Sequence, residues 1–238
     1  MATMEDVTAS QSNATTTPSF DWPTTIASGD VLAIAIAQRE ASSTASVTAV
    51  PAGFTQKEIH AQNFSHGIQL WEYVADGTET GTFSVTCATT GRAMCVIARY
   101  SGAASINVSD IGEAFNFDTT HTLPTITTLE DAAQVGMFMA QADPDESPWL
   151  AGVPAGSSTA LGATNTGPNA LALMFSGFEE ATAGATGTQA WTVESQLSVG
   201  VIFSIENSAG GGGSQVITRL AGPGGMVGPG GLVGPGLA

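Results

Sequence analysis

The stretch Val-Leu-Ala-Ile-Ala-Ile-Ala-Gln, residues 31–38, decides the fold. The large side chains of Leu32, Ile34 and Ile36 alternate with those of three alanines. Successive side chains of a β-strand point to opposite faces, so this period of two predicts a strand. The same period recurs in residues 82–88 and 197–205, where Phe83 and Val85, and Val201 and Phe203, occupy alternate positions.

Helical periodicity is scarce, and the alternating segments are bounded at short intervals by Gly, Pro, Asn and Asp. This pattern predicts an all-β fold, an antiparallel β-sandwich of jelly-roll-like form.

A second feature is a set of matches between the two halves of the chain. Gln141, Pro154 and Leu173 each lie 103 positions after a residue of the same type, Gln38, Pro51 and Leu70. The offset is 108 from Phe83 to Trp191 and 105 from Ile97 to Ile202. Ordered matches of this kind indicate an internal duplication, with halves of about 29–108 and 125–207, whereas chance similarity of short apolar strands is the alternative. We expect one shared core over 29–207 rather than two tandem sandwiches, because a half alone buries little surface.

Two arms are predicted outside this sandwich, an N-terminal arm at 1–28 and a Gly/Pro-rich tail at 208–238. Phe20 and Trp22 are the expected docking residues of the first arm. Residues 222–236 of the tail read GPGGMVGPGGLVGPG, with glycine at every third position. This pattern fits a strand at a trimer axis or a strip in a groove of another protein, and composition alone predicts disorder. The docking residues expected in the tail are Met226, Val227, Leu232 and Val233.

The charge balance restricts the partners. Charged residues make up 11% of the chain, and the formal net charge is −16. Neither nucleic acid nor an anionic membrane is expected as a partner, because both require clustered Lys and Arg. We expect instead a homo-oligomer or a protein packed among other proteins. The N-terminus has no signal-peptide pattern and no apolar run has transmembrane length, so synthesis in the cytoplasm is expected.

Residues for chemistry are few. The three histidines have no metal-ligand spacing and are expected at the surface or at strand edges, without a catalytic role. Asp143, Asp145 and Glu146 form an acidic cluster that either binds a cation such as calcium or makes a solvated turn. Cys87 and Cys95 are expected to face each other across a hairpin, as two core thiols or as a disulfide. No catalytic residue, cofactor or metal is assigned, and we expect no enzymatic activity.

The segments SGDVLAIAIAQRE, VPAGFTQ, LWEYVADGTETGTFSVT and RAMCVIARYSGA, within residues 28–103, resemble surface β-sandwich proteins of tailed bacteriophages. The resemblance implies a structural protein of the virion. We expect a capsid decoration or cement protein that docks on the shell through its terminal arms. The alternative is a trimeric tail-fibre module that binds a host glycan.

Overall fold

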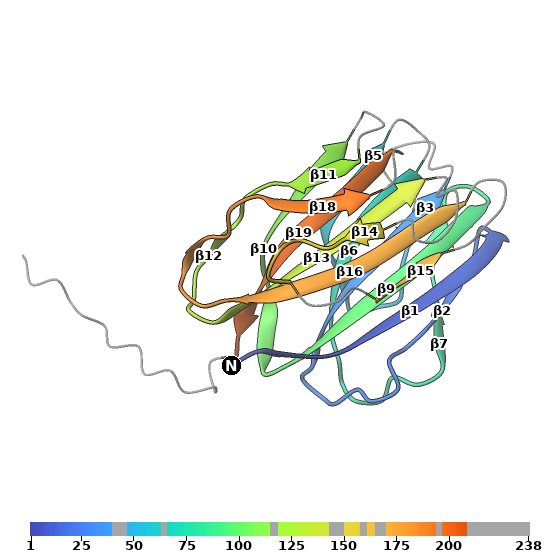
Figure 1. The fold of residues 1–238 in the computed structure, drawn as a ribbon. Helices are drawn as coiled ribbons and strands as arrows, with labels where there is room; N and C mark the ends of the chain where they lie inside the picture. The colour runs from blue at the N-terminus through green and yellow to red at the C-terminus, as the bar shows by residue number, and fades with distance from the viewer. Residues whose placement is uncertain are drawn as a thin grey trace, which may run out of the picture.

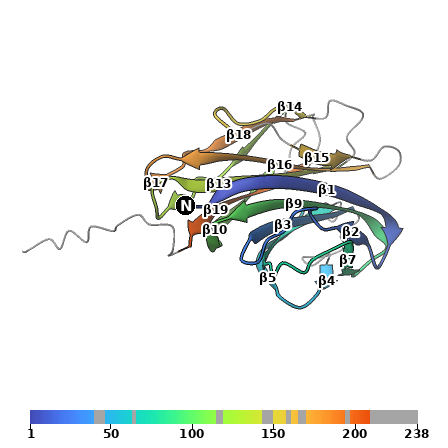
Figure 2. The ribbon, with the colours of Figure 1, turned by 90° about the horizontal axis from the view of Figure 1, so that it is seen from below.

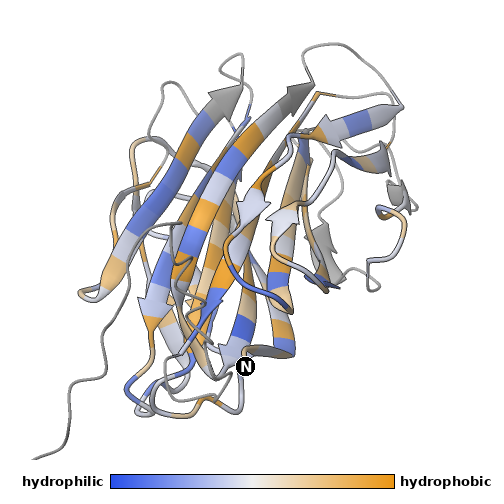
Figure 3. Cartoon of the chain, turned by 90° about the vertical axis from the view of Figure 1, so that its left-hand side faces the viewer, coloured by the Kyte–Doolittle hydropathy of each residue, from blue (hydrophilic) through white to orange (hydrophobic). Residues whose placement is uncertain are grey.

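The computed structural model describes residues 1–39, 47–62, 66–114, 119–142, 150–157, 161–164, 170–193 and 197–208. In these ranges the regular elements are all β-strands, and every strand pairing is antiparallel (Figure 1). The predicted all-β antiparallel sandwich is therefore confirmed. Hydrophobic and hydrophilic residues alternate along many of the strands (Figure 3), as the period of two requires.

Two five-stranded sheets form the centre of the molecule. In order across the first sheet, the strands are β1 (Thr3–Thr15), β9 (Gly91–Ser101), β3 (Val31–Arg39), β6 (His66–Val74) and β5 (Phe54–Gln62). Across the second sheet they are β10 (Ala103–Ala114), β19 (Ser198–Asn207), β13 (Ala133–Ala142), β16 (Leu171–Glu180) and β15 (Leu161–Thr164).

The two sheets have the same strand order, with corresponding strands from corresponding parts of the chain. Ile34 of β3 pairs with Ile97 of β9, and Met137 of β13 pairs with Ile202 of β19. Met137 lies 103 positions after Ile34, and Ile202 lies 105 positions after Ile97, which are the offsets seen in the sequence. The origin of the halves by duplication stays a prediction.

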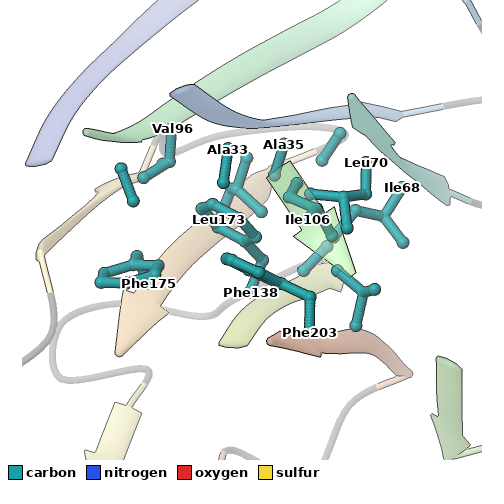
Figure 4. Packing of buried hydrophobic residues seen from close by; sticks show 14 of the residues in the cluster. Ala33, Ala35, Ile68, Leu70, Val96, Ile106, Phe138, Leu173, Phe175 and Phe203 are labelled. Carbon is teal, nitrogen blue, oxygen red and sulfur yellow. The ribbon is translucent and has the colours of Figure 1, made fainter. Parts of the chain in front are cut away.

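The sheets pack face to face around a central core to which both contribute. The alanines of β3 point into this core, opposite the large rings of Phe138, Phe175 and Phe203 (Figure 4). The Phe138 and Phe203 rings are stacked with centroids 5.5 Å apart. Small residues on one sheet thus leave room for aromatic rings on the other, which is how two sheets fill a core at close packing.

Short strands cover the outer face of each sheet and enclose a further core there. The pairs β2 (Ser19–Asp21) with β7 (Thr82–Ser84) and β4 (Val47–Ala49) with β8 (Thr86–Cys87) cover the first sheet. The second sheet is covered by β11 (Thr120–Leu123), β18 (Gln189–Val193) and β14 (Leu150–Gly152), and by β12 (Thr127–Thr128) with β17 (Gly184–Ala185). Figure 2 shows these layers outside the two sheets. The expected shared core is therefore the central one of three.

The N-terminal segment is not an arm. Residues 3–15 form β1, which pairs with β9 at the edge of the first sheet, and Phe20 in β2 is 1% exposed. A bulge at Glu5 explains why the sequence pattern did not predict this strand. Ala2 and Met4 precede the bulge, Val7 and Ala9 follow it, and all four pack on the central core. The inserted residue shifts the phase of the alternation, so no continuous period of two is visible.

The boundary between the halves also differs from the predicted one. The first sheet ends with β9 at Ser101, and the second begins with β10 at Ala103, so residues 103–124 belong to the second half. Gly102 carries the chain from one sheet to the other with a φ of 62°. A Cβ at this position would lie 2.5 Å from the carbonyl oxygen of Met1, which leaves glycine as the fitting residue.

The predicted hairpin that brings Cys87 opposite Cys95 is wrong. Cys87 in β8 pairs with Val47, whereas Cys95 in β9 pairs with Ser10 and Ile36. Both cysteines are buried and unbridged. Burial raises the pKa of the Cys87 thiol to about 11, so it stays protonated at neutral pH.

Candidate docking site

A groove of about 280 Å³ lies between the start of β1, the start of β13 and the end of β16. It is lined by Thr3, Met4, Tyr100, Gln134, Val135, Gly177, Phe178 and Glu179. The groove therefore lies between the two sheets, at the end of the sandwich where β1 begins.

The groove combines an apolar wall with one buried hydroxyl group. Met4, Val135 and Phe178 supply apolar surface, while exposed Glu179 lies at the rim and accepts a hydrogen bond from Gln134 (3.3 Å). Tyr100 is 1% exposed and packs edge-on against Phe203. Its hydroxyl group has no hydrogen-bond partner among the described residues, and burial raises its pKa far above the ordinary value. A buried hydroxyl without a hydrogen-bond partner costs free energy of folding.

The free edge of β1 continues from this groove. Among the described residues β1 pairs with β9 alone, and its other edge is unpaired. The strand has 13 residues, and Val7 to Thr15 contains no charged residue and no proline. Edge strands in monomeric proteins usually carry charged residues or prolines that prevent pairing with another chain. This edge is therefore suited to the addition of a strand from a partner.

On the opposite long side of the sandwich, charged and polar side chains protect the edge strands. There β5 of the first sheet meets β10 of the second. The Lys57 ammonium lies 3.2 Å from the Glu72 carboxylate and donates a hydrogen bond to the backbone carbonyl of Ile106 (3.0 Å). The Glu72 carboxylate accepts a hydrogen bond from the backbone N–H of Ile106, and Ser109 donates one to Glu58 (2.7 Å). Side chains of the first sheet thus satisfy the edge of β10.

Both ends of the described chain lie beside the groove. The backbone N–H of Ala2 donates to the Asn207 side chain, and that of Ser208 donates to the carbonyl of Gly102 (2.9 Å). The described chain therefore begins and ends close to Thr3 and Tyr100 in the groove wall; the N-terminus is marked in Figure 1.

Two of the three histidines are placed differently from the prediction. His66 and His121 are 0% and 1% exposed, whereas partly buried His60 lies in the edge strand β5. The His121 Nδ1 atom lies 2.6 Å from the Ser198 hydroxyl. A histidine can be buried when its ring is neutral and finds a polar partner, which the sequence pattern did not reveal.

Burial lowers the pKa of both rings. The pKa of His66 falls to about 3 through burial and then through the nearby charges of Arg39, His60 and His121. Burial lowers the pKa of His121 to about 4, against a hydrogen bond with the Gly112 backbone that acts in the opposite direction. Both rings are therefore neutral at pH 7. In the described part of the chain, no group of three or more His, Cys, Asp or Glu residues is arranged to hold a metal ion.

The docking residues predicted in the N-terminal arm lie in the protein's own fold. Phe20 is buried in the outer core of the first sheet, so the prediction that it docks on a neighbour is wrong. Trp22 is partly buried, with its ring centroid 4.4 Å from that of Phe83 and 5.2 Å from that of Tyr73. Aromatic packing within the chain occupies both side chains.

The other predicted site residues lie outside the described residues. These are Asp143, Asp145 and Glu146 in the acidic cluster and Met226, Val227, Leu232 and Val233 in the tail.

The segments that carry the phage resemblance have local structural roles. At the start of β3, Asp30 accepts hydrogen bonds from the Ala27 N–H and from Arg99 (both 2.9 Å). In the VPAGF turn, Gly53 has a φ of 93° and lies against the Tyr73 ring. These residues position strands and turns.

No protein-family model matches the chain, and neither the curated proteins nor the solved structures include a significant match. Across its described ranges, the structure holds no helix with the length and apolar character needed to cross a membrane.

Proposed function

We propose that this chain is a non-enzymatic structural protein that binds neighbouring proteins in an assembly, as a decoration or cement protein on the capsid of a tailed bacteriophage. The observation that carries the proposal is the free edge of β1, which is long, uncharged from Val7 to Thr15 and unpaired among the described residues. An added strand binds through main-chain hydrogen bonds and needs no complementary charge. This mode of binding suits a chain with so few charged residues.

The composition supports the same proposal. Only 11% of the residues are charged, whereas ordinary soluble domains have about 25%. A surface of Ser, Thr, Ala and Gly suits close contact with other subunits. The docking element differs from the terminal arm expected from the sequence, because it is a strand of the sheet itself.

The direct test is quantitative mass spectrometry of purified particles of the phage that encodes the chain. A decoration protein is expected in a fixed ratio to the shell subunit. A few copies that purify with tails would support the fibre alternative instead. Absence from purified particles would contradict both roles.

A matched pair of variants tests the edge. Gln11 in β1 and Gln56 in β5 are both exposed residues of edge strands. Gln11→Lys places a charge on the free edge and is expected to abolish binding of the purified protein to particles that lack it. Gln56→Lys makes the same change on the other edge and is expected to bind normally. Equal binding by both variants would exclude the β1 edge as the docking surface.

A further inference from the structure

We propose that the groove between β1, β13 and β16 receives residues 215–221 of the same chain, Gln-Val-Ile-Thr-Arg-Leu-Ala, as an extended segment. This contact lies within one chain and does not depend on a role in a virion. It leaves the β1 edge from Val7 to Thr15 for a partner.

The described chain ends close to the groove. Ser208 is bonded to Gly102, two residues after Tyr100 in the groove wall. Residues 209–214 are Ala-Gly-Gly-Gly-Gly-Ser, and such a segment spans about 20 Å at most. The groove is therefore within reach of residue 215, and the short connection gives a high effective concentration.

The side chains of residues 215–221 match the groove. Val216, Ile217 and Thr218 are β-branched and favour an extended backbone. In an extended segment Ile217 and Arg219 point to the same side. Ile217 can then enter the apolar groove while Arg219 approaches Glu179 at its rim.

Charge points to the same occupant. Arg219 is the only charged side chain in residues 209–238, and the whole chain has a net charge of −16. The exposed Glu179 carboxylate offers an opposite charge.

The test compares amide NMR spectra of the full chain and of a chain that ends at Ser208. The proposal predicts shift differences at Met4, Tyr100, Val135 and Phe178. A peptide of residues 209–221 added to the short chain should move these signals toward their positions in the full chain. Unchanged groove signals in both comparisons would overturn the proposal.

Variants in the tail sharpen the test without affecting the core. Ile217→Ser is expected to weaken peptide binding about tenfold or more, because it removes a buried aliphatic side chain. Val233→Ser in the full chain is the control, because it lies beyond the proposed segment and should leave the groove signals unchanged. Arg219→Glu in the peptide should weaken binding about two- to fivefold. Glu179→Lys in the folded chain should restore binding of this variant peptide, because both charges are then reversed. Equal binding of the wild-type and Ile217→Ser peptides would contradict the proposal.

Light scattering identifies whose tail occupies the groove. The same-chain proposal predicts groove signals that do not change with concentration, because the tail and the groove belong to one chain. Groove shifts that grow with concentration together with a doubled mass would show a neighbour's tail in the groove and would overturn the same-chain occupant.

Discussion

The edge strands of the two sheets meet along two long sides of the sandwich, and these two seams are built differently although equivalent strands form them. The β5/β10 side is called the closed seam, and the β1/β15 side the open seam. At the β5/β10 seam, Ile106 pairs with Ile205, and its free backbone groups are taken by Glu72 and Lys57. The equivalent residue at the other seam is Met4, which pairs with Tyr100, 105 positions before Ile205. Both edge strands have a bulge directly after this residue. Where the first seam has an ion pair, the second has a groove and a hydroxyl without a described partner.

This difference shows how one architecture can protect one edge and expose another. The ion pair at the first seam belongs to the fold, since it satisfies the backbone of the neighbouring sheet. The second seam has the same strand order without those charges. We therefore expect changes at the first seam to affect stability and changes at the second to affect binding.

The largest effect is expected from the core that both seams enclose. Phe138 is fully buried and packs on Phe175 and Phe203. Phe138→Ala should lower the free energy of unfolding by about 3–5 kcal/mol, because it removes a large ring and leaves a cavity. Urea unfolding measures this. A loss below about 1 kcal/mol would show that the two sheets do not share this core.

The next effect concerns the histidines near the closed seam. Folding lowers the pKa of His66 to about 3 and that of His121 to about 4, whereas both are about 6.5 in the unfolded chain. At pH values between the folded and the unfolded pKa, the unfolded state binds more protons than the folded state. The contribution of each buried neutral ring to the free energy of unfolding is therefore fully present above pH 6.5 and is lost as the pH falls below it. Each ring should contribute about 1.4 kcal/mol per pH unit below 6.5.

His121→Gln should therefore reduce the dependence of stability on pH between 6.5 and 4.5. Urea unfolding of wild type and variant at several pH values measures the difference, and the carboxylates common to both cancel. Parallel pH profiles would contradict a buried neutral ring at this position.

A smaller effect is expected from breaking the closed seam itself. Glu72→Gln leaves the Lys57 ammonium without its partner and should cost about 1–3 kcal/mol. Glu179→Gln at the open seam is the matched control, since Glu179 is exposed and should change stability by less than about 0.5 kcal/mol. Equal losses for the two variants would remove the distinction between the seams.

The smallest effect on stability is expected on the free edge. Gln11→Lys should change the free energy of unfolding by less than about 0.5 kcal/mol, because Gln11 is exposed. The effect of Gln11→Lys on particle binding would then come from the added charge on the β1 edge and not from a loss of stability. A loss of more than about 1 kcal/mol in urea unfolding would show that the variant damages the fold.

The sequence predicted the strands whose alternation is unbroken. In β3 the isoleucines and alanines point to opposite faces, as the period of two requires. The sequence failed at β1, where the bulge at Glu5 interrupts the alternation and polar residues suggest a loop.

The candidate site was harder to predict than the fold. Its residues come from β1, β9, β13 and β16, and only the packing of the two sheets brings Met4 near Phe178. No local motif marks such a groove. The buried histidines were missed for a similar reason, because the partner of His121 is Ser198, 77 residues away.

Amide hydrogen exchange of the full chain tests the difference between the seams most directly. The account predicts that the Ile106 N–H exchanges slowly, because Glu72 holds it. The outward N–H groups of β1 between Thr8 and Ser12 should exchange much faster, because among the described residues no strand pairs with that edge. Equally slow exchange throughout both edges would show that the β1 edge is covered, and would contradict its role as the docking surface.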